Sequence, residues 1–241
     1  MRPTSMRLNL VLIALALAVI LNAELPVSAQ SASNSAALDS VLKTMDSAAA
    51  SFRTTKAEFE WDRYERVIDD VDDVQSGTIY YRRTGKDVDM KLDITKPDLK
   101  YVLFADGKFR VYQPKPDQVT VYDAGKNRAD FESYLILGFG GSGQDMVKAF
   151  DVTYVGPETI QGIATAKLQL IPKSEKLRQT FKQISLWIDL DRGISVQQQF
   201  FEPQGDYRLA KYSSIKVNQK IGNDVFQLKT TSKTQTVTPR S

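Results

Sequence analysis

The alternation of apolar and polar positions along the chain predicts a protein made mainly of β-strands. Residues 57–62 read Ala-Glu-Phe-Glu-Trp-Asp and residues 87–94 read Asp-Val-Asp-Met-Lys-Leu-Asp-Ile. This period of two is typical of a strand with one buried and one solvated face. About eleven strands are predicted on this basis, at residues 57–67, 78–83, 87–94, 101–105, 108–112, 119–122, 152–155, 165–171, 183–188, 196–202 and 207–217.

Short turns separate most of these strands, so we expect an antiparallel sheet. Asp106-Gly107 is a strong signal for a two-residue hairpin turn between the strands on either side of it. The acidic run at residues 69–73 is interpreted as a solvated hairpin loop. It lacks the glycine and the downstream glutamate of a calcium-binding loop. Residues 224–226 are predicted to form a last packed turn, and the polar tail after Leu228 to fray.

Two segments have helical rather than strand spacing. Apolar residues recur every three or four positions over residues 35–52, which predicts an amphipathic helix with Ser35 as its N-cap. Residues 128–137 show a second helical pattern, and residues 145–150 are predicted to form one more helical turn. The second pattern runs into the glycine-rich residues 138–143 and carries the candidate lid residues Phe131, Tyr134, Leu135, Leu137, Gly138 and Gly140.

A sheet whose strands are apolar on one side is expected to curl around that side. The predicted fold is therefore mainly β (α+β), an unclosed antiparallel half-barrel with an N-terminal helix and a helical lid over an apolar cavity. Either the helices fill this cavity as an ordinary core, or the lid opens and acyl chains enter, each buried CH₂ contributing roughly 0.8 kcal/mol. The candidate cavity residues are Phe59, Trp61, Ile79, Tyr81, Val88, Met90, Leu92, Leu103, Phe109 and Val111.

The N-terminus is typical of an export signal. Arg2 and Arg7 precede an apolar run at residues 8–21, and Val27-Ser28-Ala29 forms a small-residue cleavage site before Gln30. The run is shorter than the roughly 20 residues of a membrane span, although a short uncleaved anchor is an alternative. We expect a signal peptide at residues 1–29, one periplasmic domain at 30–228 and a flexible tail at 229–241. The mature chain is expected to be a monomer.

The composition excludes most of the common types of enzyme active site. The chain has no histidine and no cysteine, so the usual catalytic triads, zinc sites and disulfides are excluded. Its net charge is +3, which is too balanced to indicate nucleic-acid binding. Gly143 is followed by Gln144, whereas a phosphate loop needs lysine there and a nucleophile elbow at Ser142 needs glycine. We expect no cofactor and no enzymatic activity; the alternative is a pair of carboxylates that converge in a cleft.

A series of short motifs, in order along almost the whole mature chain, resembles the periplasmic lipoprotein carriers of the LolA family. The series begins with the helix that ends at Phe52 and the strand around Phe59. The later motifs are GTIYYRR at residues 77–83, KP at 96–97, DGK at 106–108, YQP at 112–114, QVT at 118–120, ID at 188–189, DRG at 191–193 and NDVF at 223–226.

The resemblance implies an unclosed β-barrel with a helical lid over a hydrophobic cavity. Such carriers accept lipoprotein acyl chains from an inner-membrane transporter and pass them to an outer-membrane receptor. The family motif also implies a role for Arg83, as an arginine that contacts the lid in the closed state; Thr84 stands where the family has proline. Related alternatives are a carrier of other lipids or glycolipids and an envelope-stress sensor of the same fold. The lipid-anchored receptor of this fold needs an N-terminal cysteine, and the sequence contains no cysteine.

Overall fold

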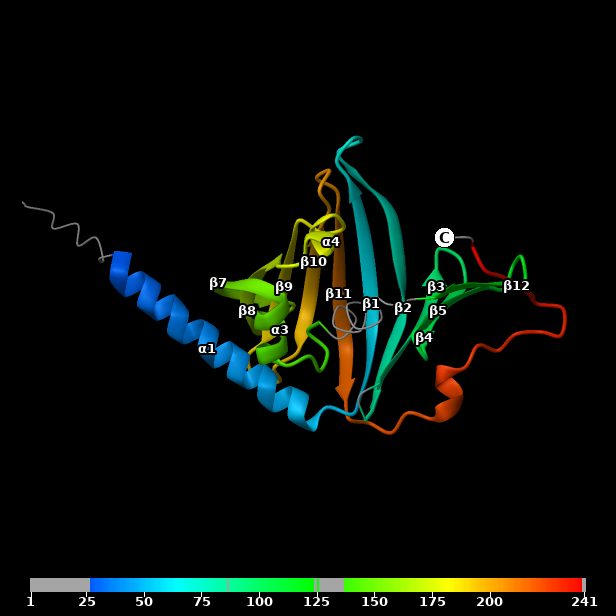
Figure 1. Cartoon of the computed structure of the whole chain (residues 1–241), viewed down its shortest axis with the longest axis horizontal. Coiled ribbons are helices and arrows are strands. Elements are labelled where there is room, and N and C mark those ends of the chain that lie inside the picture. Colours follow the sequence, from blue (N-terminus) through cyan, green and yellow to red (C-terminus); the bar gives the residue numbers. More distant parts are fainter. Residues whose placement is uncertain (1–26, 86, 124, 126–136, 240–241) are drawn as a thin grey trace, which may run out of the picture.

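The protein is built around one sheet of twelve strands. The computed structural model describes residues 27–85, 87–123, 125 and 137–239. The strand order is β12-β6-β5-β4-β3-β2-β1-β11-β10-β9-β8-β7, so β12 and β7 each have a single neighbour and the sheet stays open (Figure 1). The strands are β1 (Thr54–Glu65), β2 (Asp70–Thr84), β3 (Asp87–Lys96), β4 (Lys100–Ala105), β5 (Lys108–Gln113), β6 (Gln118–Asp123), β7 (Phe150–Ile160), β8 (Ile163–Pro172), β9 (Gln183–Asp189), β10 (Ser195–Phe201), β11 (Tyr207–Val217) and β12 (Gln235–Val237).

The predicted mainly-β, unclosed antiparallel fold is confirmed. Each of the eleven predicted strands overlaps an observed one, and neighbouring strands pair antiparallel except for β12, which pairs parallel with β6. The turn at Asp106 and Gly107 is also confirmed, since both residues have positive φ, at 55° and 69°. Among the described residues the helical elements are α1 (Val27–Ser51), α3 (Gly143–Ala149), α4 (Glu175–Arg178) and the 3₁₀ turn η2 (Asn223–Phe226).

The core consists of two clusters of buried side chains. The first, here the barrel cluster, lies on the inner face of β1–β4 and β11; its buried members are Phe52, Ala57, Phe59, Ile79, Tyr81, Val88, Met90, Leu92, Ile94, Phe104, Phe139, Ala210 and Tyr212. The second, here the helix cluster, lies between α1, α3 and β7–β10; its buried members are Val41, Leu42, Met45, Leu137, Met146, Phe150, Ala166, Leu168, Leu170, Ile184, Leu186, Ile188 and Phe200.

The N-terminal helix is longer than predicted. It begins at Val27, so Ser35 lies inside the helix and is not its N-cap. Residues 28–51 contain neither glycine nor proline, and their many alanines favour helix, so nothing stops the helix at residue 35. In Figure 1 the first turns extend away from the body, and the later turns cross the β7–β10 half of the sheet. The predicted cleavage site lies within this helix, and cleavage there stays a prediction.

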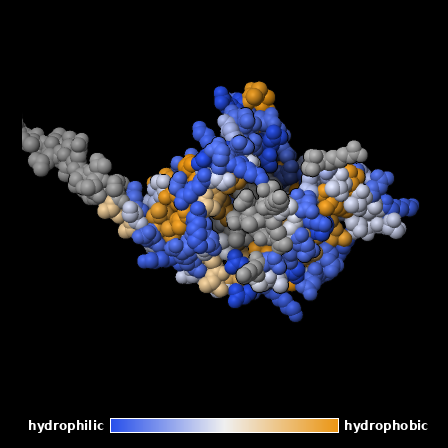
Figure 2. Space-filling model, viewed as in Figure 1, coloured by the Kyte–Doolittle hydropathy of each residue, from blue (hydrophilic) through white to orange (hydrophobic). Residues whose placement is uncertain are grey.

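The acidic run at residues 69–73 was predicted as a hairpin loop; the hairpin is present, but only Asp69 of this run lies in its turn, so the prediction is wrong for residues 70–73. The turn occupies residues 66–69, and β2 begins at Asp70. The acidic residues fit into a strand because a β-bulge leaves Asp72 without a pairing partner on β1. The Asp72 carboxylate lies 3.7 Å from the Arg63 guanidinium on β1. At the tip of this long hairpin, Val67 is 94% and Ile68 56% exposed, an apolar spot that is visible in Figure 2.

The C-terminal tail is also more ordered than predicted. Residues 235–237 form β12, and Asp117 in the β5–β6 turn accepts hydrogen bonds from the hydroxyls of Thr231 (2.7 Å) and Thr234 (2.6 Å). The predicted packed turn at residues 224–226 is confirmed as η2, where Phe226 lies under the guanidinium of Arg82 at 4.2 Å. The tail therefore covers part of the outer side of the β2–β6 half of the sheet.

The predicted helix at residues 128–137 lies outside the described residues except for Leu137. The helical turn predicted at 145–150 is present as α3, which begins two residues earlier, because the Ser142 hydroxyl caps it by accepting a hydrogen bond from the Asp145 amide at 3.0 Å. No helix in the described part of the chain combines the length and the apolar composition needed to cross a membrane.

Candidate functional site

The inner face of the barrel half carries most of the predicted cavity residues. Phe59, Ile79, Tyr81, Val88, Met90 and Leu92 are all buried members of the barrel cluster. Trp61 and Phe109 are partly buried and pack against this cluster. Val111 lies on the same face, because it pairs directly with Val102, but it is only partly buried and is not part of the cluster.

Leu103 is the exception, and its assignment to the cavity is wrong. It pairs with Lys91 on β3 and with Arg110 on β5, which places it on the outer face, while Val102 and Phe104 point inward. Residues 101–104 are apolar throughout, so alternation does not tell the two faces of β4 apart. Leu103 is nevertheless only 5% exposed, so this part of the outer face is covered too.

The inner face is covered by a short turn at residues 137–140, here the lid turn. Its aromatic residue, Phe139, is fully buried and inserts into the barrel cluster. The Phe139 ring stacks on Tyr81 with 5.2 Å between ring centroids and meets the edge of Tyr212 at 4.6 Å. Phe139 thus occupies the apolar face that the sequence marks as a cavity, and in this state the face is covered.

Hydrogen bonds to three carbonyl groups hold the lid turn in place. The Ser195 amide donates to the Gly138 carbonyl at 2.7 Å, and Gln198 Nε2 donates to the Leu137 carbonyl at 2.6 Å. The third donor is Arg83, whose Nη2 lies 2.6 Å from the Gly140 carbonyl. Two of these donors come from β10 and one from β2, so the lid turn connects the two halves of the sheet.

Arg83 lies where the lid turn, the end of α1 and β2 meet. Besides Gly140 it donates from Nη1 to the Ala49 carbonyl at 3.2 Å, and its guanidinium stands over the Phe52 ring at 5.5 Å. Burial and the nearby Arg53 lower the pKa of Arg83, while Asp145 opposes this shift. An arginine stays charged in proteins, so the guanidinium is a permanent donor to these carbonyls.

Two glycines allow the lid turn to lie this close to its neighbours. Gly138 and Gly140 have φ of +79° and +82°, a conformation that side-chain-bearing residues rarely adopt. A Cβ on Gly140 would stand 2.4 Å from the Phe52 ring, and one on Gly138 would stand 2.5 Å from Ser195 Cβ. The predicted lid residues Leu137, Gly138 and Gly140 therefore lie in the cover itself. Phe131, Tyr134 and Leu135 lie outside the described residues.

Two hollows near this region differ in character. A cavity of about 110 Å³ lies behind the lid turn, between Met45 of α1 and Met146 of α3. A wider, open hollow of about 480 Å³ lies largely on the opposite face of β1 and β2, where polar side chains such as Glu58, Glu60 and Lys211 line it. Its polar lining does not suit an acyl chain, so the covered inner face is the better candidate site.

Sequence reasoning missed several residues of the cover. Phe139 has a recognisable signal, an aromatic residue between two glycines, but Ser195 and Gln198 have none. Strand β10 reads SVQQQFF, and only the fold shows that Gln198, unlike its two glutamine neighbours, is buried and bonded to both the Tyr212 hydroxyl and the Leu137 carbonyl.

Comparisons with known proteins agree with this geometry. The family described as outer membrane lipoprotein carrier protein LolA matches residues 50–229. No curated protein matches the sequence. Among solved structures, an uncharacterized conserved protein from Thermus thermophilus has a TM-score of 0.53 at 12% identity, over 86% of this chain and 99% of that one. MucB has a TM-score of 0.51 at 14% identity, over 80% of this chain, which spans only 63% of the MucB chain.

Lipoprotein LppX from Mycobacterium tuberculosis has a TM-score of 0.46 at 12% identity, over 78% of this chain and 98% of that one. At such low identity these likenesses concern the fold alone. The family match is of a different kind, because it covers most of the described domain, including the strands that form the inner face and the residues of the cover. The chain belongs to the LolA family of outer membrane lipoprotein carrier proteins.

Proposed function

We propose that the protein is a periplasmic carrier that binds the acyl chains of lipoproteins on the inner face now occupied by Phe139, and moves them from the inner to the outer membrane. The observation that carries this proposal is a continuous apolar face closed by a cover that only a few polar contacts hold. The family match supports the class of cargo. The role is one of binding and release, without a catalytic step.

The energies make exchange between cover and cargo feasible. Three hydrogen bonds contribute about 1 kcal/mol each, and the buried Phe139 ring about 3 kcal/mol. An acyl chain that buries about ten methylene groups gains roughly 8 kcal/mol. One chain can therefore displace the lid turn, and the lid turn can help to expel the chain when an acceptor offers another apolar site.

A carrier of this kind needs a donor and an acceptor. We infer that the donor is an inner-membrane lipoprotein-releasing transporter and that the acceptor is an outer-membrane protein. The long β1–β2 hairpin exposes Val67 and Ile68 at its tip, and this apolar tip gives either partner a surface to recognise.

The proposal is tested by titrating the purified full chain with a fluorescent fatty-acyl probe and by native mass spectrometry of protein from the envelope. We expect saturable probe binding at one site, competition by a diacylated lipopeptide, and co-purifying lipid or lipoprotein. A protein that emerges without lipid and does not bind the probe would refute the carrier role. Competition by free glycolipid but not by lipopeptide would refute lipoprotein as the cargo.

A further inference from the structure

Two buried hydrogen-bond donors on the inner face of β1 lack a partner. Trp61 Nε1 and Arg63 Nε are both shielded from solvent, and no acceptor in the described part of the chain lies within hydrogen-bonding reach. Both follow Phe59 at a period of two along β1, so their side chains belong to the face that carries the barrel cluster. Buried donors without an acceptor are costly and uncommon, and a pair at the edge of a binding face indicates a ligand contact.

The other shielded atoms of this kind do not form such a pair. Asp93 Oδ1 lies 3.0 Å from Lys91 Nζ and is therefore neutralised by an ion pair. Thr55 Oγ1 is at the opposite end of β1, where its strand partner is Tyr81 under the lid turn. Only Trp61 and Arg63 are neighbours on one face, about 7 Å apart along the strand.

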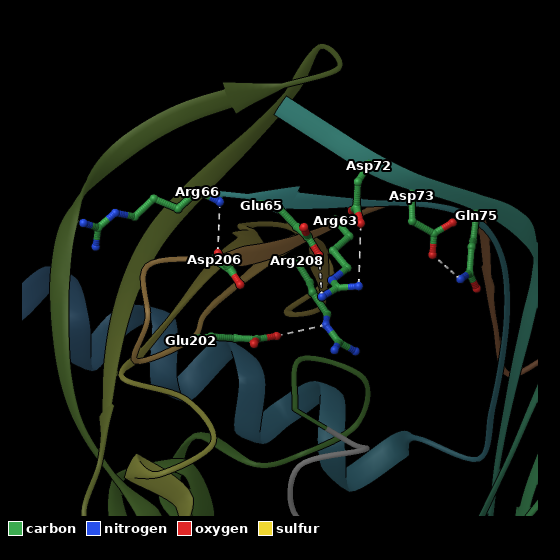
Figure 3. Close-up of polar contacts among 9 residues, drawn as sticks. All are labelled: Arg63, Glu65, Arg66, Asp72, Asp73, Gln75, Glu202, Asp206 and Arg208. Carbon is green, nitrogen blue, oxygen red and sulfur yellow. Dashed lines mark hydrogen bonds and ion pairs between the residues drawn. The ribbon is translucent and has the colours of Figure 1, made fainter. Parts of the chain in front are cut away.

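The outer nitrogens of Arg63 are already engaged. In a side chain that is 41% exposed, Nη2 lies 2.8 Å from Glu65 and Nη1 lies 3.7 Å from Asp72, while the shielded Nε–H group has no acceptor (Figure 3). The Trp61 ring packs against Phe59, with 4.9 Å between the ring centroids. Trp61 therefore lies between Phe59 and Arg63, where the apolar face ends and the polar end of the half-barrel begins.

The charge at the polar end of the half-barrel determines which kind of hydrogen-bond acceptor can bind to Trp61 and Arg63. This end carries three arginines and five carboxylates, and Arg208 is itself paired with Glu202 at 3.2 Å. A phosphate or free carboxylate would enter a cluster with excess negative charge, whereas an uncharged carbonyl oxygen would not be repelled. The members of the cluster, all drawn in Figure 3, are Arg63, Arg66, Arg208, Glu65, Asp72, Asp73, Glu202 and Asp206.

We propose that Trp61 Nε1 and Arg63 Nε bind the ester carbonyl oxygens of a diacylglyceryl group whose acyl chains lie along the inner face. This inference rests on the proposed function and specifies which part of the lipid is recognised. The two esters sit on adjacent glycerol carbons, so one molecule offers an acceptor to each donor. Both donors are shielded from solvent at the end of β1 opposite to Thr55, and a lipid that lies along the inner face would meet them there.

The test compares 1,2-dipalmitoylglycerol with its ether analogue, 1,2-di-O-hexadecylglycerol, as competitors of the fluorescent fatty-acyl probe on the full chain. The ether lacks both carbonyl oxygens and keeps the chains. We expect the wild type to prefer the ester by about tenfold, because the ether leaves both donors unpaired. Trp61→Phe and Arg63→Lys each remove one donor while keeping the ring or the charge, and each should reduce the preference to a few-fold.

Trp187→Phe is the matched control, since Trp187 Nε1 is bonded to Glu158 at 2.5 Å on β7 and should not affect the ester preference. Equal affinity of the wild type for ester and ether would overturn the inference while leaving the carrier role intact. An ester preference unchanged in both variants would overturn it as well. Failure of both lipids to compete would instead count against the proposed function. If Trp61→Phe does not fold, the ester preference of Arg63→Lys alone tests the inference.

Discussion

At the scale of single residues, Arg83 is the side chain on which the cover depends most. Arg83→Leu removes the donors to the Ala49 and Gly140 carbonyls, so the closed state loses about 1–3 kcal/mol while the sheet is unaffected. We expect a folded protein whose transfer of a bound acyl probe to acceptor vesicles is slowed about tenfold, because release returns the protein to a weakened closed state. Stopped-flow fluorescence measures this rate.

Arg82→Leu provides the control for Arg83→Leu. Arg82 is the neighbouring arginine on β2, but it lies on the outer face and pairs with Asp89 at 2.6 Å. Its substitution should alter stability and leave the transfer rate unchanged. Transfer at the wild-type rate in Arg83→Leu would remove Arg83 from the functional site.

A second residue-scale prediction concerns the buried hydroxyl of Thr55. Thr55 is fully buried and its Oγ1 has no partner in the described residues, so the isosteric Thr55→Val should raise the free energy of unfolding by about 1 kcal/mol. Thr54→Val is the matched control and should be neutral or destabilising, because Thr54 Oγ1 donates to the Gln219 carbonyl at 2.6 Å. Urea denaturation measures both values; a destabilised Thr55→Val would show that the hydroxyl is satisfied in solution.

Single residues also show where sequence reasoning stops. The period of two placed Phe59, Ile79, Tyr81 and Met90 on the inner face, where the structure has them, because their neighbours along each strand are mostly polar. It failed at Leu103, where residues 101–104 are all apolar and the outer face is buried as well. The period of two could not identify Gln198, because the burial of this one glutamine among three depends on the lid turn that packs against it.

At the scale of elements, the carboxylate of Asp117 adds to the pairing of β12 with β6 in holding the end of the tail. Hydrogen bonds from Thr234 and Thr231 lower the pKa of Asp117, so the contact is present above the ordinary carboxyl pKa and is lost as pH falls through the lowered value. We expect Asp117→Asn to free β12 at neutral pH. Amide exchange at residues 235–237, corrected for its intrinsic pH dependence, measures the effect.

Asp106→Asn is the control for the tail, since Asp106 also occupies a hairpin turn with positive φ but is not bonded to β12. Its substitution should leave exchange at residues 235–237 unchanged. If β12 stays protected in Asp117→Asn and in acid, pairing with β6 alone holds the tail.

Elements with strong local signals were predictable, and those decided by distant partners were not. Strand β3 alternates strictly, and the Asp106-Gly107 turn requires only its own two residues. The start of β2 was missed because its acidic residues favour solvent until Arg63 of β1 is placed beside Asp72 and opposite Asp73. Strand β12 was missed because its partner, β6, lies more than a hundred residues away and the pairing is parallel.

At the scale of the whole molecule, the lid turn connects two packed halves that also meet through the sheet and through α1 with Phe52 at its end. Leu137 belongs to the helix cluster and Phe139 to the barrel cluster, so adjacent parts of one turn are anchored in different cores. Movement of this turn therefore changes the packing of both halves at once. A cargo that displaces Phe139 is expected to weaken the packing of the helix cluster as well. The cavity of about 110 Å³ beside this cluster lets its side chains rearrange.

This coupling predicts opposite effects of Phe139→Ala on stability and on binding. Loss of a fully buried phenylalanine should lower the free energy of unfolding by about 3–5 kcal/mol. The same change removes the group that competes with cargo for the inner face, so affinity for the acyl probe should rise on the order of tenfold. Phe150→Ala, in the helix cluster, should cost similar stability without a gain in affinity. If Phe139→Ala weakens probe binding, Phe139 forms part of the ligand's contact surface and does not act as its competitor.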